Sequence, residues 1–311
     1  MFKTIYNIKE TVKPLVFGNA HGFSKPVFIL SAPRSGSTHL YEILRRCSNV
    51  ISLDQENDSF WWSMFPYSRL DPPNDFIHSC EVDTDYAKKV RAALCHHLTH
   101  TLFNKNFTKF LKLRFHSGKL IYLEKTIANC FHLEALTILF PDARFIYLFR
   151  DGRATISSMI EGWNAGRFMK RILPFSDNSS IDYWTYPIPP GWEKKAHKKL
   201  NEICAWSWLQ HNKCVLDFFE TTPVLQKNLV RVSYENLVTK PDKTINALIS
   251  FCDFRKSRQV DSYLHDNLPS RTTISKPKNI KWQHSNVEDI MEIENLIAPM
   301  MARLGYPGVL A

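Results

Sequence analysis

Short apolar runs alternate with helix-like segments along most of the chain. The runs lie at residues 27–30, 50–52, 120–123, 145–149 and 230–233. A strand that helices cover on both faces is apolar on both sides, so such runs are typical of a parallel sheet. The pattern predicts an α/β fold of three layers, in which a central parallel sheet is flanked by helices.

Two of the segments between or after these runs carry clear helix signals. Residues 131–140 are mostly apolar and stop at Pro141, as a helix before a proline does. Near the C-terminus, apolar residues recur at helical spacing before Gly305, and they are Val287, Ile290, Ile293, Ile297, Met301 and Leu304. We expect helices at both places.

Two long stretches interrupt the alternation, at about residues 54–118 and 162–199. The second stretch is rich in proline, tryptophan and tyrosine. Ligands of an open α/β sheet bind beyond the carboxyl ends of its strands, and both insertions leave from that side. We expect them to form a substrate pocket, with simple packing of a lid or small subdomain as the alternative.

The size and composition fit a folded enzyme-sized domain. The length of 311 residues and the hydrophobic content of 44% are ample for one domain over residues 1–311. Seven scattered cysteines without a Cys-x-x-Cys pair argue against a disulfide framework and against a thiolate zinc site. The chain shows neither an apolar run long enough to span a membrane nor the apolar core of a signal peptide, so we predict a cytoplasmic protein without integral membrane association.

The chain is basic, with a formal net charge of +10. A basic balance suggests anionic ligands, and nucleic acid is one of them. The lysines and arginines are spread along the chain without a nucleic-acid-binding motif. We therefore expect a small anionic nucleotide and no nucleic acid.

The most specific chemistry follows the first apolar run directly. Small residues, Ser35 to Thr38, come between that run and a helix-like segment. Their backbone N–H groups can converge on a phosphate at a helix N-terminus, whose partial positive charge favours an anion. A nucleotide triphosphatase loop would continue from Gly36 with lysine, whereas Ser37 stands there and the cation, Arg34, lies on the strand side. An ordinary structural turn is the alternative.

A second strand–turn–helix pattern follows residues 145–149. Arg150 stands at the end of the predicted strand, and Ser158 comes eight positions later, which is about two helical turns. From there a guanidinium and a hydroxyl can both reach one phosphate, and arginine suits bidentate phosphate binding. A turn closed by an Arg150–Asp151 pair is the alternative.

Both patterns resemble the nucleotide sites of the sulfotransferases that use 3′-phosphoadenosine 5′-phosphosulfate (PAPS). That family has Pro-Arg/Lys-Ser-Gly-Thr/Ser-Thr after its first strand, and an arginine with a serine eight residues later at its 3′-phosphate site. Further segments in the same order look like family segments, and they are 123–126, 231–237, 281–282 and 304–307. The chain is closer to the bacterial, carbohydrate and tyrosylprotein types than to the cytosolic phenol and steroid type. The resemblance implies a P-loop-like fold.

The resemblance also implies roles for single residues. Arg34 and Lys125 would be catalytic cations at the leaving phosphate and the transferring sulfuryl group. Glu56 would be the general base, with Asp54 as the competing candidate. The residues implied in nucleotide binding are Arg34, Ser35, Gly36, Ser37, Thr38, His39, Arg150, Ser158, Tyr234 and Lys278.

The implied function is transfer of the sulfuryl group from PAPS to a hydroxyl or amine of a small-molecule, carbohydrate or lipid-linked acceptor, with PAP as the product. We expect no metal, because His96 and His100 lie one helical turn apart without an obvious third ligand. Two other functions stay open, a P-loop-like nucleotide kinase and a noncatalytic protein that binds nucleotides or polyanions. Aromatic side chains in the insertions suit a phenol, a sugar or a lipid-linked acceptor alike.

Overall fold

A computed structural model describes residues 25–116, 120–266 and 281–306. Within them, five parallel strands form a sheet in the order β2-β3-β1-β4-β5. The strands are β1 (Val27–Leu30), β2 (Val50–Ile51), β3 (Ile121–Glu124), β4 (Arg144–Phe149) and β5 (Leu229–Ser233). The predicted parallel sheet is confirmed, and every strand boundary lies within one residue of its predicted place.

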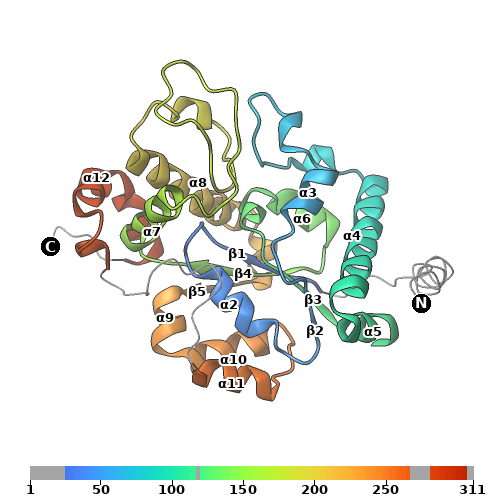
Figure 1. Cartoon of the computed structure of the whole chain (residues 1–311). Coiled ribbons are helices and arrows are strands. Elements are labelled where there is room, and N and C mark those ends of the chain that lie inside the picture. The colour runs from blue at the N-terminus through green and yellow to red at the C-terminus, as the bar shows by residue number, and fades with distance from the viewer. Residues whose placement is uncertain (1–24, 117–119, 267–280, 307–311) are drawn as a thin grey trace, which may run out of the picture.

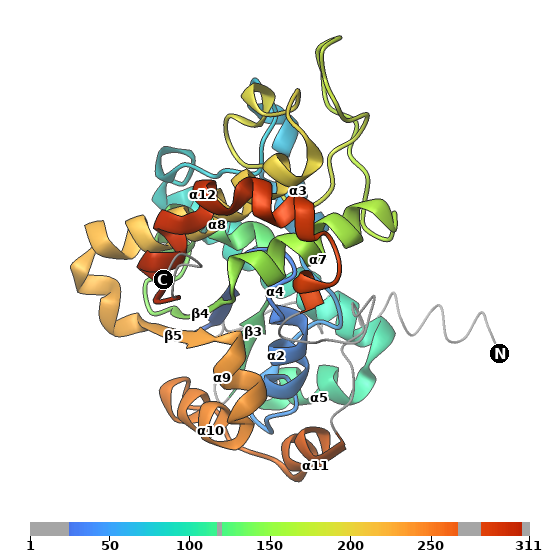
Figure 2. The ribbon, with the colours of Figure 1, turned by 90° about the vertical axis from the view of Figure 1, so that its left-hand side faces the viewer.

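Helices cover both faces of this sheet (Figure 1). One face is covered by α2 (Ser37–Leu44), α9 (Tyr234–Thr239), α10 (Pro241–Phe251) and α11 (Arg258–Asp266). The opposite face carries α3 (Asp58–Met64), α4 (Thr84–Lys105), α5 (Phe107–His116), α6 (Leu133–Leu139), α7 (Gly152–Asn164), α8 (Leu200–Thr221) and α12 (Val287–Leu304). Short 3-10 helices occupy Tyr67–Arg69, Ser79–Glu81, Ile127–Phe131, Trp192–Lys194, Pro223–Asn228 and Lys281–Gln283. Figure 2 shows the same three layers after a quarter turn.

Alternate residues of the central strand enter two separate cores. Phe28 and Leu30 pack with the helices of one face, and Val27 and Ile29 pack with those of the other. Successive side chains of a strand point to opposite faces, so a sheet between two helical layers needs apolar residues at every position. The continuous apolar runs of the sequence have this physical cause.

One predicted helix differs in the structure, and the other is confirmed. The segment 131–140 is divided, because Ile127–Phe131 forms a 3-10 helix and α6 begins only at Leu133. At the break, the buried His132 ring lies 3.1 Å from the side-chain oxygen of Asn129. The side-chain nitrogen of Asn129 donates to the buried Glu124 carboxylate. These side-chain bonds hold the chain in its bend. At the other end of the chain, α12 ends at Gly305 as predicted.

A buried ion pair joins the two insertions. Arg171 Nη1 lies 2.8 Å from Asp75 Oδ2, and both side chains are almost wholly covered. The same carboxylate oxygen accepts from the Ile188 amide at 2.6 Å. Trp62 donates to the other oxygen of Asp75 at 3.1 Å, and its ring also lies under the Arg171 guanidinium. We call this arrangement of Arg171, Asp75, Trp62 and Ile188 the clasp.

The strand order brings distant parts of the chain together. Because β1 lies between β3 and β4, the residues that follow these three strands meet at the carboxyl edge of the sheet. This is the edge at which open α/β sheets bind ligands.

Candidate active site

The loop between β1 and α2 has a backbone shape that requires glycine at Gly36. Gly36 has a φ of +95°, and Arg34 also takes the left-handed region with a φ of +66°. A Cβ atom on Gly36 would lie 2.4 Å from the Tyr234 ring. Glycine is needed here both for the conformation and for the close approach of the ring.

Polar groups of this loop lack partners where the sequence predicts a phosphate. Ser35 is buried, and its hydroxyl has no hydrogen-bond partner within the described residues. The first amide groups of α2 have no carbonyl within the helix to pair with. A buried hydroxyl without a partner costs free energy, and an anion at the loop would supply the missing acceptor. The loop therefore fits a phosphate group.

Arg34 connects this loop to the second predicted phosphate site. Its Nε donates to the Ser158 hydroxyl at 3.2 Å, and its guanidinium lies 5.2 Å from the centre of the Phe168 ring. Burial lowers the pKa of Arg34, and the positive charge of Arg150 lowers it further. A bound anion would relieve this repulsion.

Arg150 reaches the same place from the end of β4. Its Nη1 donates to the backbone carbonyl of Arg34 at 3.2 Å, and its guanidinium lies 4.4 Å from the centre of the Tyr234 ring. The sequence predicts that Arg150 and Ser158 share one phosphate, but Ser158 contacts Arg34 in this structure. The two predicted phosphate sites are thus neighbours joined by Arg34.

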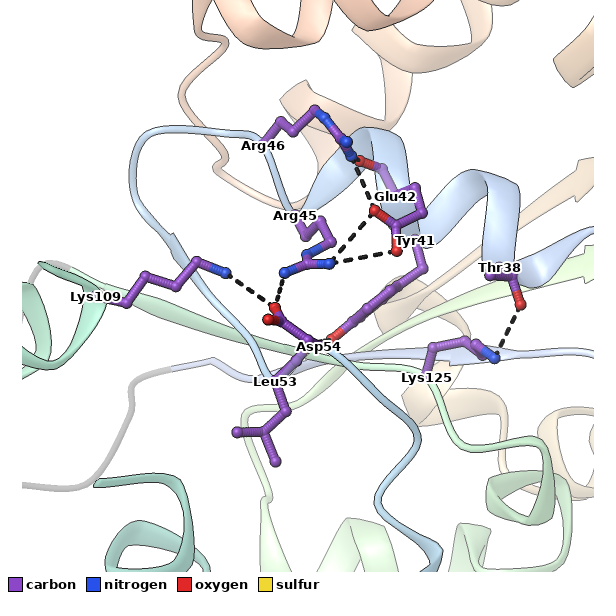
Figure 3. Close-up of polar contacts among 9 residues, drawn as sticks. All are labelled: Thr38, Tyr41, Glu42, Arg45, Arg46, Leu53, Asp54, Lys109 and Lys125. Atoms are coloured by element: carbon purple, nitrogen blue, oxygen red, sulfur yellow. Dashed lines mark hydrogen bonds and ion pairs between the residues drawn. The ribbon is translucent and has the colours of Figure 1, made fainter. Parts of the chain in front are cut away.

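A buried ammonium group lies on the other side of the loop. Lys125, which follows β3, forms an ion pair with Glu56. Its Nζ also lies 3.2 Å from the Thr38 hydroxyl, and Figure 3 draws this second contact. The Lys125 side chain is only 4% exposed. Glu56 also accepts from the Ile127 amide at 3.4 Å. Thr38, Glu56 and Lys125 lie far apart in the sequence, where only the family resemblance relates them. In the structure they meet within hydrogen-bonding distance.

Asp54, the competing candidate for the general base, is bound elsewhere. Its exposed carboxylate forms an ion pair with Arg45 and lies 3.8 Å from Lys109. Figure 3 shows Asp54 directed toward these two side chains, while Lys125 is directed toward Thr38. Glu56 is therefore the candidate base that contacts the predicted catalytic lysine, and its role stays a prediction.

Two residues near the site, Asp58 and Phe168, were not predicted from the sequence as site residues. Asp58 opens α3, and burial raises its pKa to about 7, with the negative charges of Glu56 and Asp75 adding to the shift. Phe168 covers Arg34 from the second insertion. Asp58 lies two positions after Glu56, which was a usable signal, whereas no spacing in the sequence connects Phe168 with Arg34.

Of the other residues predicted to contact the nucleotide, His39 and Tyr234 lie in the described part of the chain and Lys278 does not. The His39 ring lies 6.1 Å from the Tyr263 ring of α11, and burial lowers the pKa of His39. Tyr234 is buried beneath Gly36 and Arg150. Lys278 lies outside the described residues, so its predicted contact has no structural counterpart here.

The described residues contain neither a helix suited to crossing a membrane nor a cluster of metal-ligating side chains. None of their helices is both long and apolar enough to cross a bilayer. In the same part of the chain, no three histidine, cysteine or acidic side chains are grouped as metal ligands would be. His96 and His100 lie 6.3 Å apart, measured between ring centres.

The fold and the site together define an α/β protein in which the two loops predicted to bind phosphate adjoin at the carboxyl edge of the sheet. A sequence model described as the Sulfotransferase family matches residues 26–257. This match covers well over half of the sequence, and the chain belongs to the sulfotransferase family. The family predicted from the sequence is confirmed.

The sequence identity to individual relatives is low. Protein-tyrosine sulfotransferase A of Caenorhabditis elegans is 27% identical over 181 residues, which are 54% of this chain and 40% of the relative. Protein-tyrosine sulfotransferase 1 of Danio rerio is 27% identical over 197 residues, which are 57% of this chain and 46% of the relative. The chain thus spans less than half the length of these two proteins. Among solved structures, sulfotransferase STF9 from Mycobacterium avium has a TM-score of 0.49 and 13% identity, over 97% of this chain and 82% of that chain.

Proposed function

We propose that the protein transfers the sulfuryl group of PAPS to an acceptor hydroxyl or amine and releases PAP. The observation that carries this proposal is the meeting of Arg34 and Arg150 beside the buried Ser35 hydroxyl. PAPS carries anionic groups at both its 5′ and 3′ positions, so it suits two adjoining cationic subsites. Membership of the sulfotransferase family supports the same ligand.

Each subsite has a proposed occupant. The start of α2, from Ser35 to Thr38, would hold the 5′-phosphate, and Arg150 would hold the 3′-phosphate. PAPS would supply an activated sulfuryl group, whose bond to the 5′-phosphate oxygen breaks as the bond to the acceptor oxygen forms. Arg34 would stabilise the charge that develops on the leaving phosphate.

Lys125 and Glu56 would act as a pair that an anion separates. In the structure they form an ion pair and neutralise each other. An anion at Thr38 would compete with Glu56 for the Lys125 ammonium, which would then stabilise charge in the transition state. The released carboxylate could accept the proton of the acceptor hydroxyl. In this order of steps, Glu56 is the general base and Lys125 is the catalytic cation.

Calorimetric titration with PAP, without added metal, tests nucleotide binding. We expect wild-type protein to bind PAP, and Arg150→Ala to weaken binding about 10- to 100-fold, because a charge-assisted hydrogen bond is lost. Arg231→Ala is the control, since Arg231 on neighbouring β5 lies over Phe149, outside the proposed subsites. Tight binding of ATP with Mg²⁺ and none of PAP would contradict the proposal and favour the nucleotide kinase.

The proposed acceptor is a small molecule, a carbohydrate or a lipid-linked group. A tyrosine hydroxyl in a peptide is a second candidate, supported by the names of the two curated relatives. Labelled PAPS offered to separate pools of metabolites, glycans, lipids and tyrosine-containing peptides distinguishes the two. Label in peptides alone would contradict the first candidate.

We further propose that the reaction takes place in the reducing environment of the cytoplasm. None of the seven cysteines, which all lie in the described part of the chain, forms a disulfide, and five of them are buried. Burial raises the pKa values of Cys47 and Cys214 to about 11, so both thiols stay protonated and unreactive near neutral pH. Fractionation of the cells that make the protein tests this location, and recovery in a secreted fraction would contradict it.

A further inference from the structure

Helix α5 carries an apolar ridge that faces solvent. Phe107, Leu111 and Phe115 follow one another at intervals of four residues, and they are 55%, 38% and 73% exposed. Residues four apart lie on the same face of a helix. The side of α5 that faces the protein is occupied by Phe110 and Leu113, both buried. The ridge is therefore additional to the apolar face that packs against the core.

This ridge lies in the most basic part of the chain. Between residues 86 and 123 the sequence has eight lysines and arginines and neither aspartate nor glutamate. Lys105 and Lys112 are exposed beside the ridge, while Lys109 is half-buried and lies 3.8 Å from Asp54. Exposed aromatic side chains with cationic neighbours are the composition of helices that lie on anionic lipid surfaces.

We propose that α5 docks on a membrane surface that carries anionic lipid headgroups. Its ten residues would extend over about 15 Å, half the thickness of a bilayer core, so the helix would lie along the interface without crossing it. The three apolar side chains would enter the acyl boundary, and Lys105 and Lys112 would contact phosphates. This docking does not depend on sulfuryl transfer.

The composition of the ridge and its neighbours favours an anionic membrane over two other binding partners, a second copy of the chain and a nucleic acid. A second copy of the chain on the same ridge would bring two strongly basic surfaces together, which repel each other. A single-stranded nucleic acid would use the lysines and could stack on the phenylalanines, but Leu111 at the centre of the ridge has no π face for a base. An anionic bilayer attracts the positive charge with its headgroups and can bury the aliphatic side chain among its acyl chains.

Helix α12 offers a matched control. Met291 on α12 is 67% exposed, which is comparable with Phe115, but its neighbours Glu288 and Glu292 are acidic. An exposed apolar side chain in an acidic surface has no reason to bind anionic lipid.

Co-sedimentation of the full chain with vesicles tests the proposal. We expect binding to vesicles of phosphatidylcholine with phosphatidylglycerol, little binding to phosphatidylcholine alone, and release at high salt. The double variant Phe107→Ser/Phe115→Ser should bind about tenfold more weakly or worse, because both inserted rings are lost. Lys105→Glu/Lys112→Glu should also lose binding, and Met291→Ser should bind as wild type does. Thermal melting checks that each variant is folded.

Several outcomes would overturn the proposal. They are absence of binding to the anionic vesicles, undiminished binding of the double phenylalanine variant, and equal loss in Met291→Ser. A dimer in light scattering that the phenylalanine variant abolishes would identify a second copy as the occupant. Binding of an oligonucleotide in place of vesicles, lost in the same variant, would identify nucleic acid. None of these measurements uses turnover, so failure here is distinct from failure of the proposed reaction.

Discussion

At the scale of single residues, the site is dominated by charges that need partners. Lys125 is 4% exposed and Glu56 32% exposed, so their ion pair lies largely outside the screening of water. Removing one member of a buried pair leaves the other uncompensated. Glu56 therefore compensates the charge of Lys125 in the folded protein, in addition to its proposed role as base.

Glu56→Gln tests the proposed role of Glu56 as general base separately from nucleotide binding. We expect turnover to fall by about 10²- to 10⁴-fold, because the amide cannot accept the acceptor proton. PAP binding should persist, because the proposed subsites at the loop and at Arg150 are unchanged. Asp54→Asn is the control, and it should keep nearly full turnover because Asp54 is bound to Arg45. Steady-state kinetics beside calorimetry with PAP give both quantities, and unchanged turnover in Glu56→Gln would refute the assignment.

Gly36→Ala should damage the phosphate loop more than its backbone strain alone explains. Gly191 has a φ of +82° but nothing within 4 Å of its added Cβ, whereas a Cβ on Gly36 meets the Tyr234 ring. Gly191→Ala should thus show only the conformational cost of about 1 kcal/mol. Gly36→Ala should lose more stability and also PAP affinity, measured by urea denaturation and calorimetry. Equal effects of the two substitutions would show that the Tyr234 contact is unimportant.

Residues at strand ends could be found from the sequence, and residues in the insertions could not. Arg34, Lys125 and Arg150 each come within four residues of the end of an apolar run, and the parallel sheet brings such ends to one edge. Phe168 reaches Arg34 from an irregular segment whose path no periodicity specifies. The contact of Ser158 with Arg34 depends on which strands are neighbours, and strand order is not encoded in local spacing.

At the scale of elements, the clasp connects the two insertions that flank the site. Arg171 and Asp75 come from different insertions, and both are buried and bonded to each other. Asp75 also accepts from the Ile188 amide. The first insertion is largely helical, but the second has little regular structure of its own. Its path therefore depends on side-chain contacts such as the clasp.

Arg171→Met should be strongly destabilising. We expect the free energy of unfolding to fall by about 3–5 kcal/mol, because the Asp75 carboxylate stays buried without its cation. Lys88→Met removes an ion pair with Asp85 that is 65% and 83% exposed, and it should cost at most about 1 kcal/mol. Urea denaturation of both variants makes the comparison. A similar small cost for both would show that the clasp does not hold the insertions together.

Asp58 should make the stability of the folded chain depend on pH. Its pKa is about 7 in the folded protein against an ordinary value of 3.8. Between these values the folded state holds a proton that the unfolded state has lost, so the stabilisation from this group is full below pH 4 and falls as pH rises to about 7.

Asp58→Asn should remove this dependence. We expect the variant to melt roughly 5–15 °C above wild type at pH 8, with the difference shrinking or reversing near pH 4. Asp85→Asn is the control, because Asp85 is exposed in the first turn of α4. Calorimetric melting across this pH range measures both, and a constant difference between Asp58→Asn and wild type would contradict the shifted pKa.

At the scale of the whole molecule, the apolar runs predicted the layers but left the order of the strands open. Every residue of β1 is buried against one core or the other, and this is visible as a continuous apolar run. The position of β1 between β3 and β4 follows from the connection from β1 to β3, through α2, β2 and the first insertion, and from the connection from β3 to β4 through α6. Neither connection carries a local signal of strand order. The resemblance to a known family implied a P-loop-like fold, and the strand order itself was not predicted.

The contact between Gly36 and Tyr234 has a consequence for the order in which the protein assembles during its synthesis. The loop emerges early from the ribosome, but the ring that packs against it follows β5, after most of the chain has been made. Contacts between residues this far apart form late, because closing a long loop costs entropy before the contact repays it. A nascent chain that has not reached β5 would therefore have the phosphate-loop sequence without the support beneath it, and nucleotide binding would begin only once nearly the whole fold is in place.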